Sequence, residues 1–305
     1  MPERDVISTP CYAKINLALA VGPPEPPGSA KPGYHPICSL FACVGLCDDL
    51  VVQRVDGAST YDLAWADDAP RTSPIDWPLD KDLGVRAHRA LEARAGRALP
   101  IRLTLRKRIP VGGGLGGGSS NAAGVLRVVR DLFALPLHTD ELRGAGATLG
   151  SDVPFFVGGA AESQALVEGF GERVTRGRWL APGAAFVLIL PPFGCPTGEV
   201  YRAFDALNPL PLRPERAARL LDALARGQAR ASDYFNDLAV AAEHVSPALR
   251  DLRHAIGQSL SRPAHVSGSG STLFVAAGSG DEARALAARV RQDFPACVAV
   301  ASAAI

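Results

Sequence analysis

The sequence lacks any hydrophobic run long enough to cross a membrane. Its longest strongly apolar stretch, AAFVLIL at 184–190, is far shorter than the ~20 residues that a bilayer-spanning helix needs. The first ten residues, MPERDVISTP, carry charges but no apolar segment, so a signal peptide is not expected. We therefore expect a soluble, cytoplasmic protein with no membrane partner.

The chain also lacks an excess of charge of either sign. It has 32 Lys and Arg against 31 Asp and Glu, which gives a formal net charge of +1. This balance gives no reason to expect nucleic acid as a partner. With 305 residues, of which 47% are hydrophobic, the chain can bury a core in one large domain or two ordinary ones.

Cys-x-x-Cys pairs are absent, although the chain contains six cysteines. Cys38, Cys43 and Cys47 lie near His35 and are conceivable as metal ligands. The segment HPICSLFACVGLC around them, however, has the pattern of an apolar strand. We favour the interpretation that the cysteines are small buried hydrophobic residues, with a metal site as the alternative.

Hydrophobic periodicity indicates alternating strands and helices without an internal repeat. IRLTLRKRI at 101–109 alternates apolar and polar residues as a half-buried strand does, and 119–135 has helical spacing with Ser119 or Ser120 able to cap its start. Other helices are expected over 83–96, 213–227, 231–245 and 281–294, and strands over 12–21, 35–47, 186–190, 264–277 (two) and 297–303. The proline-rich segment 22–33 is expected to be a loop. This order predicts two α+β domains, which we place at 1–165 and 166–305.

Between the strand and the helix lies the unusual stretch PVGGGLGGGSSN at 110–121. Glycine loses more backbone freedom on folding than other residues, so such a concentration is unfavourable unless a ligand must approach the backbone closely. A glycine loop that leads into a helix N-terminus presents N–H groups and the positive end of the helix dipole to an anion. The adjacent hydroxyl groups suit a phosphate or a metal ion, so this segment predicts a phosphate-binding site.

Three familiar glycine motifs do not fit the loop. A Walker-type loop ends in Gly-Lys-Ser/Thr, and this one contains no lysine. The dinucleotide-binding fold requires an acidic residue at the end of the next strand, where none is present. A protein-kinase loop requires Val-Ala-Ile-Lys and His-Arg-Asp elements, which are missing. A flexible linker is also disfavoured, because well-patterned elements adjoin the loop on both sides.

The loop resembles the ATP-binding motif of the GHMP kinases, a family of small-molecule kinases. Two further signatures agree with it: AKINLAL near the start of the chain and SGSGSTLF at 267–274. Five short motifs follow one another along the chain: GYH, the glycine loop, GSDVPFF, EVY and NDL. Their order resembles that in one branch of the family, whose acceptor is a cytidine-diphosphate-linked methylerythritol of the non-mevalonate isoprenoid pathway. The chain departs from that pattern at Pro32, where the branch has aspartate, and at Asp82, where asparagine is common.

The resemblance implies an α+β, two-domain GHMP kinase fold, with an N-terminal ribosomal-protein-S5-like α/β domain and a C-terminal ferredoxin-like domain. It implies ATP, held by Lys107 and by Val111, Gly112, Gly113, Gly114, Leu115, Gly116, Gly117, Gly118, Ser119 and Ser120. Mg²⁺ is expected to accompany ATP with few protein ligands, and we assign Ser119 as its ligand, with Ser120 as the alternative. Lys107 could equally be a solvated strand charge.

For catalysis, the resemblance implies that Asp152 takes the proton of the acceptor hydroxyl. Lys14 lies in an otherwise apolar strand, where an ammonium needs a partner, and Asp152 is the candidate. Asn16 is expected to contact the acceptor, and Tyr34, His35 and Tyr201 to hold its cytosine. The alternatives are another GHMP kinase, for homoserine or a sugar, and a non-catalytic nucleotide-binding regulator. The sequence is compatible with a monomer or a homodimer.

Overall fold

The computed structural model describes residues 5–305, and the chain divides into two compact units. The first unit contains the segment ending at Ala13, Leu46–Val111 and Gly116–Ser163, and the second contains Lys14–Gly45, Gly112–Leu115 and Gln164–Ile305. Strands β1 (Val6–Val21) and β2 (Ile37–Arg54) therefore contribute residues to both units. The domain limits of 1–165 and 166–305 stay a prediction.

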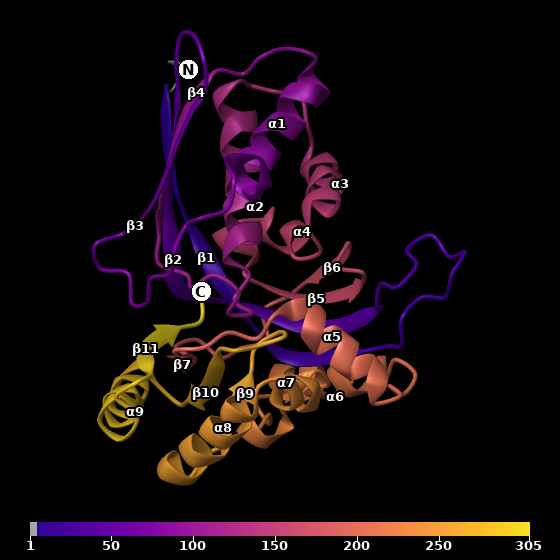
Figure 1. The fold of residues 1–305 in the computed structure, drawn as a ribbon, viewed down its shortest axis with the longest axis vertical. Helices are drawn as coiled ribbons and strands as arrows, with labels where there is room; N and C mark the ends of the chain where they lie inside the picture. The colour runs from indigo at the N-terminus through magenta and orange to yellow at the C-terminus, as the bar shows by residue number, and fades with distance from the viewer. Residues whose placement is uncertain (1–4) are drawn as a thin grey trace. The chain divides into compact units, whose positions relative to one another are not determined.

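The first unit is a sheet with helices on one face (Figure 1). Strand β3 (Thr60–Trp65) runs parallel to β4 (Ile101–Lys107), which pairs antiparallel with β2. Helices of this unit lie together on one side of these strands: α1 (Leu83–Ala95), α2 (Gly117–Leu132), α3 (Thr139–Leu149) and α4 (Val153–Phe156). Because β4 alternates buried and more exposed residues, one of its faces supplies the core beneath these helices.

Helix boundaries in the first unit follow local chemistry. Helix α1 ends at Gly96, whose φ of 63° is the left-handed conformation typical of a helix end, as predicted. It begins after Asp82, whose carboxylate accepts hydrogen bonds from the backbone N–H of Gly84 and Val85. The predicted serine cap of α2 is wrong. The helix begins at Gly117 after Gly116, which has φ 71° and no side-chain cap, so the serines lie within the first turns.

The strands of the second unit belong to two sheets. In the seven-stranded sheet that also contains β3 and β4, β5 (Gln164–Gly169) pairs with β2 and with β6 (Arg173–Arg176), and β8 (Phe235–Asn236) pairs with β1. The other has the order β11-β7-β10-β9, with β7 (Ala185–Leu190), β9 (His265–Val266), β10 (Leu273–Ala277) and β11 (Val298–Ala303). The helices are α5 (Thr197–Ala206), α6 (Pro214–Ala225), α7 (Ala239–Val245), α8 (Pro247–Leu260) and α9 (Gly280–Asp293). Helix α9 packs against β7 and β11 (Figure 1).

One predicted helix is only partly correct. The segment 231–245 begins as a short 3-10 turn, continues as strand β8 and becomes helical only at Ala239. The reason is tertiary: β8 pairs parallel with β1, and the Asn236 side chain donates to the carbonyls of Val266 and Gly268. The α+β class itself is confirmed.

The cysteines behave mostly as hydrophobic residues. All are buried except Cys47, which is half-buried. Burial raises the pKa of the Cys11 and Cys43 thiols to about 12, so both are neutral at ordinary pH. Within residues 5–305, we find no helix of the length and apolarity that crossing a membrane would require.

Candidate active site

The glycine loop has the backbone conformation that its composition predicts. Gly112, Gly114 and Gly116 have φ values of 71°, 76° and 71°, in the left-handed region that residues with a Cβ avoid. At Gly114 a Cβ would also lie 2.1 Å from the carbonyl oxygen of Ser267. A glycine is therefore required there for close backbone approach as well as for conformation.

Three consecutive carbonyls of the loop are held by other parts of the second unit. The Gly113 oxygen accepts from the Thr272 N–H at 3.2 Å, and the Leu115 oxygen accepts from the Lys14 N–H at 2.9 Å. The Gly114 oxygen accepts from the Ser267 hydroxyl at 3.0 Å. Because C=O and N–H point in opposite directions across a trans peptide, these contacts turn the intervening N–H groups away from the protein partners. That orientation suits an anion.

The same contacts bring together three segments that are far apart in the sequence. The part of β1 that begins at Lys14, the loop residues Gly112–Leu115 and the turn before β10 all belong to the second unit and meet at the loop carbonyls. These are the three segments on which the resemblance to the GHMP kinases rests.

Lys14 and Asn16 lie side by side in β1, and both are buried. The Lys14 ammonium donates to the Asn16 side-chain oxygen Oδ1 at 2.7 Å and lies 4.6 Å from the centre of the Phe41 ring. The Asn16 amide donates to the Ser39 hydroxyl at 2.9 Å, so the orientation of Asn16 is fixed from both sides. The predicted pairing of Lys14 with Asp152 stays a prediction.

Asp152 belongs to the first unit and lies half-buried immediately before α4. A carboxylate at that place often caps the following helix. Here the Asp152 side chain accepts no capping hydrogen bond from α4. A capping role therefore does not explain this residue.

Three of the residues predicted to bind nucleotide differ in accessibility. Lys107 is only 4% exposed, and its ammonium donates to Asp48 and to Asn121, each at 2.9 Å. Ser120 is buried, whereas Ser119 is half-buried in the first turn of α2. Ser119 is therefore the serine whose hydroxyl is better placed to reach a ligand.

The structure brings together two of the three residues predicted to hold a base. The His35 ring lies 4.8 Å from the Tyr201 ring, centre to centre, and its Nδ1 lies 2.9 Å from the Gly22 carbonyl oxygen. Tyr34 is 61% exposed, and its ring meets the edge of Phe170 at 6.3 Å. Tyr34 therefore has an accessible face, whereas His35 is oriented by protein contacts.

Asp48 and Asn236 make hydrogen bonds to segments next to the glycine loop, and neither residue is assigned a role from the sequence. Asn236 anchors the turn that contacts the glycine loop, and the Asp48 carboxylate is buried against Lys107. For Asn236 the signal was its place in the NDL motif. For Asp48 the only signal was a charged residue within a strongly apolar strand, which implies a buried partner.

Among the residues that the structure describes, 5–305, no cluster of His, Cys, Asp or Glu could by itself hold a metal ion. A magnesium ion that accompanies ATP needs few protein ligands, because phosphates and water supply most of its coordination.

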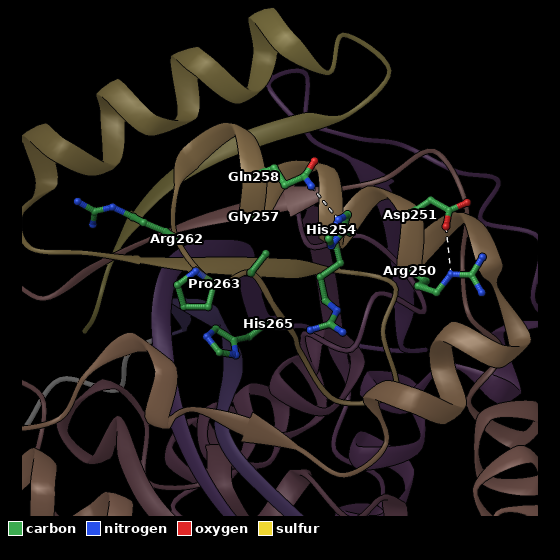
Figure 2. Close-up of a pocket in the computed structure, with 10 residues that line it drawn as sticks. Arg250, Asp251, His254, Gly257, Gln258, Arg262, Pro263 and His265 are labelled. Atoms are coloured by element: carbon green, nitrogen blue, oxygen red, sulfur yellow. Dashed lines mark hydrogen bonds and ion pairs between the residues drawn. The ribbon is translucent and has the colours of Figure 1, made fainter.

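A cavity of about 750 Å³ lies elsewhere in the second unit, along α8 and the segment that leads to β9 (Figure 2). None of the predicted site residues lines it. Its arginines already have acidic partners: Arg250 pairs with Asp251, Arg253 with Glu243 and Arg262 with Glu282. The cavity therefore has no excess of positive charge that would mark it as a second phosphate site.

Comparison with known proteins shows the family to which the chain belongs. Residues 82–160 match the family described as the GHMP kinases N terminal domain. The 4-diphosphocytidyl-2-C-methyl-D-erythritol kinase of Moorella thermoacetica is 34% identical over 296 residues, which cover 95% of this chain and 97% of that protein. The kinase of the same name from Streptomyces avermitilis is 38% identical, over 90% of this chain and 89% of the relative.

A solved structure is also similar over nearly the whole length. A crystal structure of 4-(cytidine 5'-diphospho)-2C-methyl-D-erythritol kinase superposes with a TM-score of 0.76 at 33% identity, covering 98% of this chain and 99% of the other. The chain has the GHMP kinase fold. It belongs to the GHMP kinases and, among them, to the family of 4-diphosphocytidyl-2-C-methyl-D-erythritol kinases.

Proposed function

We propose that the protein transfers the γ-phosphoryl group of ATP to the 2-hydroxyl of 4-diphosphocytidyl-2-C-methyl-D-erythritol, a step of the non-mevalonate isoprenoid pathway. The observation that carries the proposal is the meeting of Lys14, Gly112–Leu115 of the glycine loop and the Ser267 turn in the second unit. The identity to kinases of that name over nine-tenths or more of the chain supports the choice of acceptor.

The loop from Val111 to Ser120 would hold the triphosphate. Its left-handed glycines and engaged carbonyls would leave backbone N–H groups free to bind the phosphates, and the N-terminus of α2 would add a favourable dipole. The half-buried Ser119 hydroxyl would be the protein ligand of Mg²⁺. When bound, the metal supplies charge neutralisation between the phosphates.

Asp152 would accept the proton of the acceptor hydroxyl as that oxygen forms its bond to the γ-phosphorus. The bond between the γ-phosphorus and the bridging oxygen breaks, and ADP leaves with that electron pair. Lys14, buried and fixed through Asn16, would offset the negative charge that develops during transfer. Asn16 would contact the acceptor near the reacting hydroxyl.

The acceptor's cytosine would be held by Tyr34 and Tyr201 through stacking and by His35 through the base edge. Stacking on aromatic rings is worth ~1–3 kcal/mol per base and tolerates different bases. The choice of cytosine must therefore come from polar contacts, because a lost partner leaves a buried group unpaired.

The test is a phosphorylation assay with the purified chain, Mg²⁺-ATP and a panel of acceptors. The panel contains the cytidine-linked methylerythritol, its uridine analogue, homoserine and galactose, with ADP release and the phosphorus NMR spectrum of the product as readouts. Phosphorylation of the cytidine compound with the highest kcat/KM supports the proposal. A preference for homoserine or galactose would replace the acceptor, and ATP binding without turnover on any of them would favour a regulator.

A further inference from the structure

A buried cluster of polar side chains lies at the end of β4, just before the glycine loop in the sequence. It consists of Asp48 of β2, Lys107 of β4 and Asn121 of α2, all of them in the first unit and none more than 4% exposed. The Lys107 ammonium donates to Asp48 and to Asn121, each at 2.9 Å, and the Asn121 amide donates to Asp48 at 2.8 Å. The three side chains form a closed triangle of hydrogen bonds.

The Asp48 carboxylate also holds the backbone that enters the loop. Its Oδ1 accepts from the N–H of Arg108 at 2.6 Å and from the N–H of Ile109 at 2.8 Å. Its Oδ2 accepts from Lys107 and Asn121. One buried carboxylate therefore ties together the segment before the glycines and the helix after them.

A buried ion pair is by itself weak evidence for a role in stability. Buried ion pairs can often be replaced by hydrophobic residues of similar volume with no loss of stability, because desolvation offsets much of the attraction. What hydrophobic side chains cannot supply is fixed direction: four hydrogen bonds define the positions of their donors, whereas apolar contacts do not. The cluster therefore contributes orientation at both ends of the loop.

We propose that Asp48 is a positioning residue for nucleotide binding, and that Lys107 acts with it through Asn121 and the loop backbone rather than by touching the nucleotide. The inference rests on the proposed function. The cluster holds the backbone on both sides of the glycines, so that the loop N–H groups are already in place when the triphosphate binds. Displacement of aligned groups by ~1 Å lowers function by about 10²-fold, so small movements of the loop matter.

The central variant is Asp48→Asn in the full chain. Its side-chain oxygen still accepts from the backbone, but its amide group faces Lys107 and Asn121, which also donate. We expect faster hydrogen–deuterium exchange in residues 108–121 and an affinity for a non-hydrolysable ATP analogue lowered by about 10- to 100-fold. The KM for the acceptor should change less than about twofold. Asn121→Ala, which removes one corner of the triangle without removing a charge, should act in the same direction.

Two controls separate positioning from stability. Leu91→Ala removes a fully buried side chain from α1 in the same unit and should lower the melting temperature without changing loop exchange or ATP-analogue affinity. The double variant Asp48→Asn/Lys107→Met removes the uncompensated ammonium and should recover melting temperature. It should not recover affinity, because the link from β4 to α2 is still missing.

Each result decides the matter in one direction. If Asp48→Asn and Asn121→Ala both bind the ATP analogue as tightly as the wild type, the inference is wrong. It is also wrong if Leu91→Ala loses as much affinity for the analogue as Asp48→Asn does, or if the double variant recovers that affinity. If Asp48→Asn does not fold, Asn121→Ala and Leu91→Ala decide alone. A wild-type chain that binds no ATP analogue overturns the proposed function and the inference together, whereas wild-type binding with unaffected variants overturns the inference only.

Discussion

Substitution of Gly114 by alanine tests the close contact between the glycine loop and the Ser267 turn. The new Cβ would lie 2.1 Å from the Ser267 carbonyl oxygen, 3.0 Å from its carbon and 3.3 Å from the Gly270 nitrogen. All three atoms belong to backbone, so no flexible side chain can move aside. The residue also has φ 76°, which alanine adopts only with strain.

The expected loss of stability has two parts. The left-handed conformation costs about 1–2 kcal/mol for a residue with a Cβ. Relief of the clash moves the turn and weakens the bonds from Ser267 Oγ to Gly114 and from Thr272 N–H to Gly113, at about 0.5–1.5 kcal/mol each. The total is about 2–5 kcal/mol.

Gly112→Ala is the matched control. Gly112 has a similar φ of 71°, but no atom lies within 4 Å of its would-be Cβ. It should therefore lose only the strain contribution of about 1–2 kcal/mol. Urea unfolding measures the free energy of unfolding of both variants, and KM for ATP measures whether the loop still binds nucleotide. An equal loss of stability in the two variants would refute the claim that close contact, rather than conformation, requires glycine at position 114.

Three further predictions concern chemistry, acceptor binding and pH. Asp152→Asn should lower kcat by about 10²–10⁴-fold with little change in ATP affinity, and an unchanged kcat would mean that Asp152 is not the base. Tyr34→Ala and Tyr201→Ala should raise KM for the cytidine-linked acceptor and leave KM for ATP nearly unchanged; equal losses that follow melting temperature would contradict the stacking role. Desolvation by burial lowers the pKa of His265 from 6.5 to about 4, so below pH 6.5 the unfolded chain takes up a proton that the folded chain does not. Stability should therefore fall as the pH falls from 6.5 to 4, by up to ~3 kcal/mol, and His265→Gln should flatten this part of the unfolding profile; an unaltered profile would show that His265 is not responsible.

The parts of the fold that the sequence predicted are those specified by local chemistry. Helix α1 was marked by its apolar spacing and by Gly96 at its end, and β4 by strict alternation. The glycine loop was recognised because six glycines in seven residues are unfavourable without a close ligand. In each case the residues that predicted the element belong to the element itself or lie within a few positions of it.

The features that were missed depend on distant partners. Strand β8 has only two residues and exists because β1 and the Asn236 contacts hold it, so no periodicity could reveal it. The cap of α2 was misplaced because a left-handed Gly116 begins the helix without a side-chain donor or acceptor. The sequence around Asp48 indicated a buried charge but not its partner, because Lys107 lies 59 positions away. Of the site, the motifs could be read from the sequence, whereas the groups that orient them could not.

The division of β1 between the two units has a consequence for biosynthesis. The Val21 N–H at the end of β1 donates to Asp237, 216 positions later in the chain. At ~5–20 residues per second, a ribosome needs about 10–40 s to make that interval. Throughout this time the edge of β1 at Ala18 and Leu19, which pairs with β8 in the folded protein, is open, and an open strand edge is the kind of surface that pairs with other chains. We expect the second unit to fold only late in translation, and a chain stalled between residues 164 and 235 to aggregate or recruit chaperones even though every segment of the first unit has already been made.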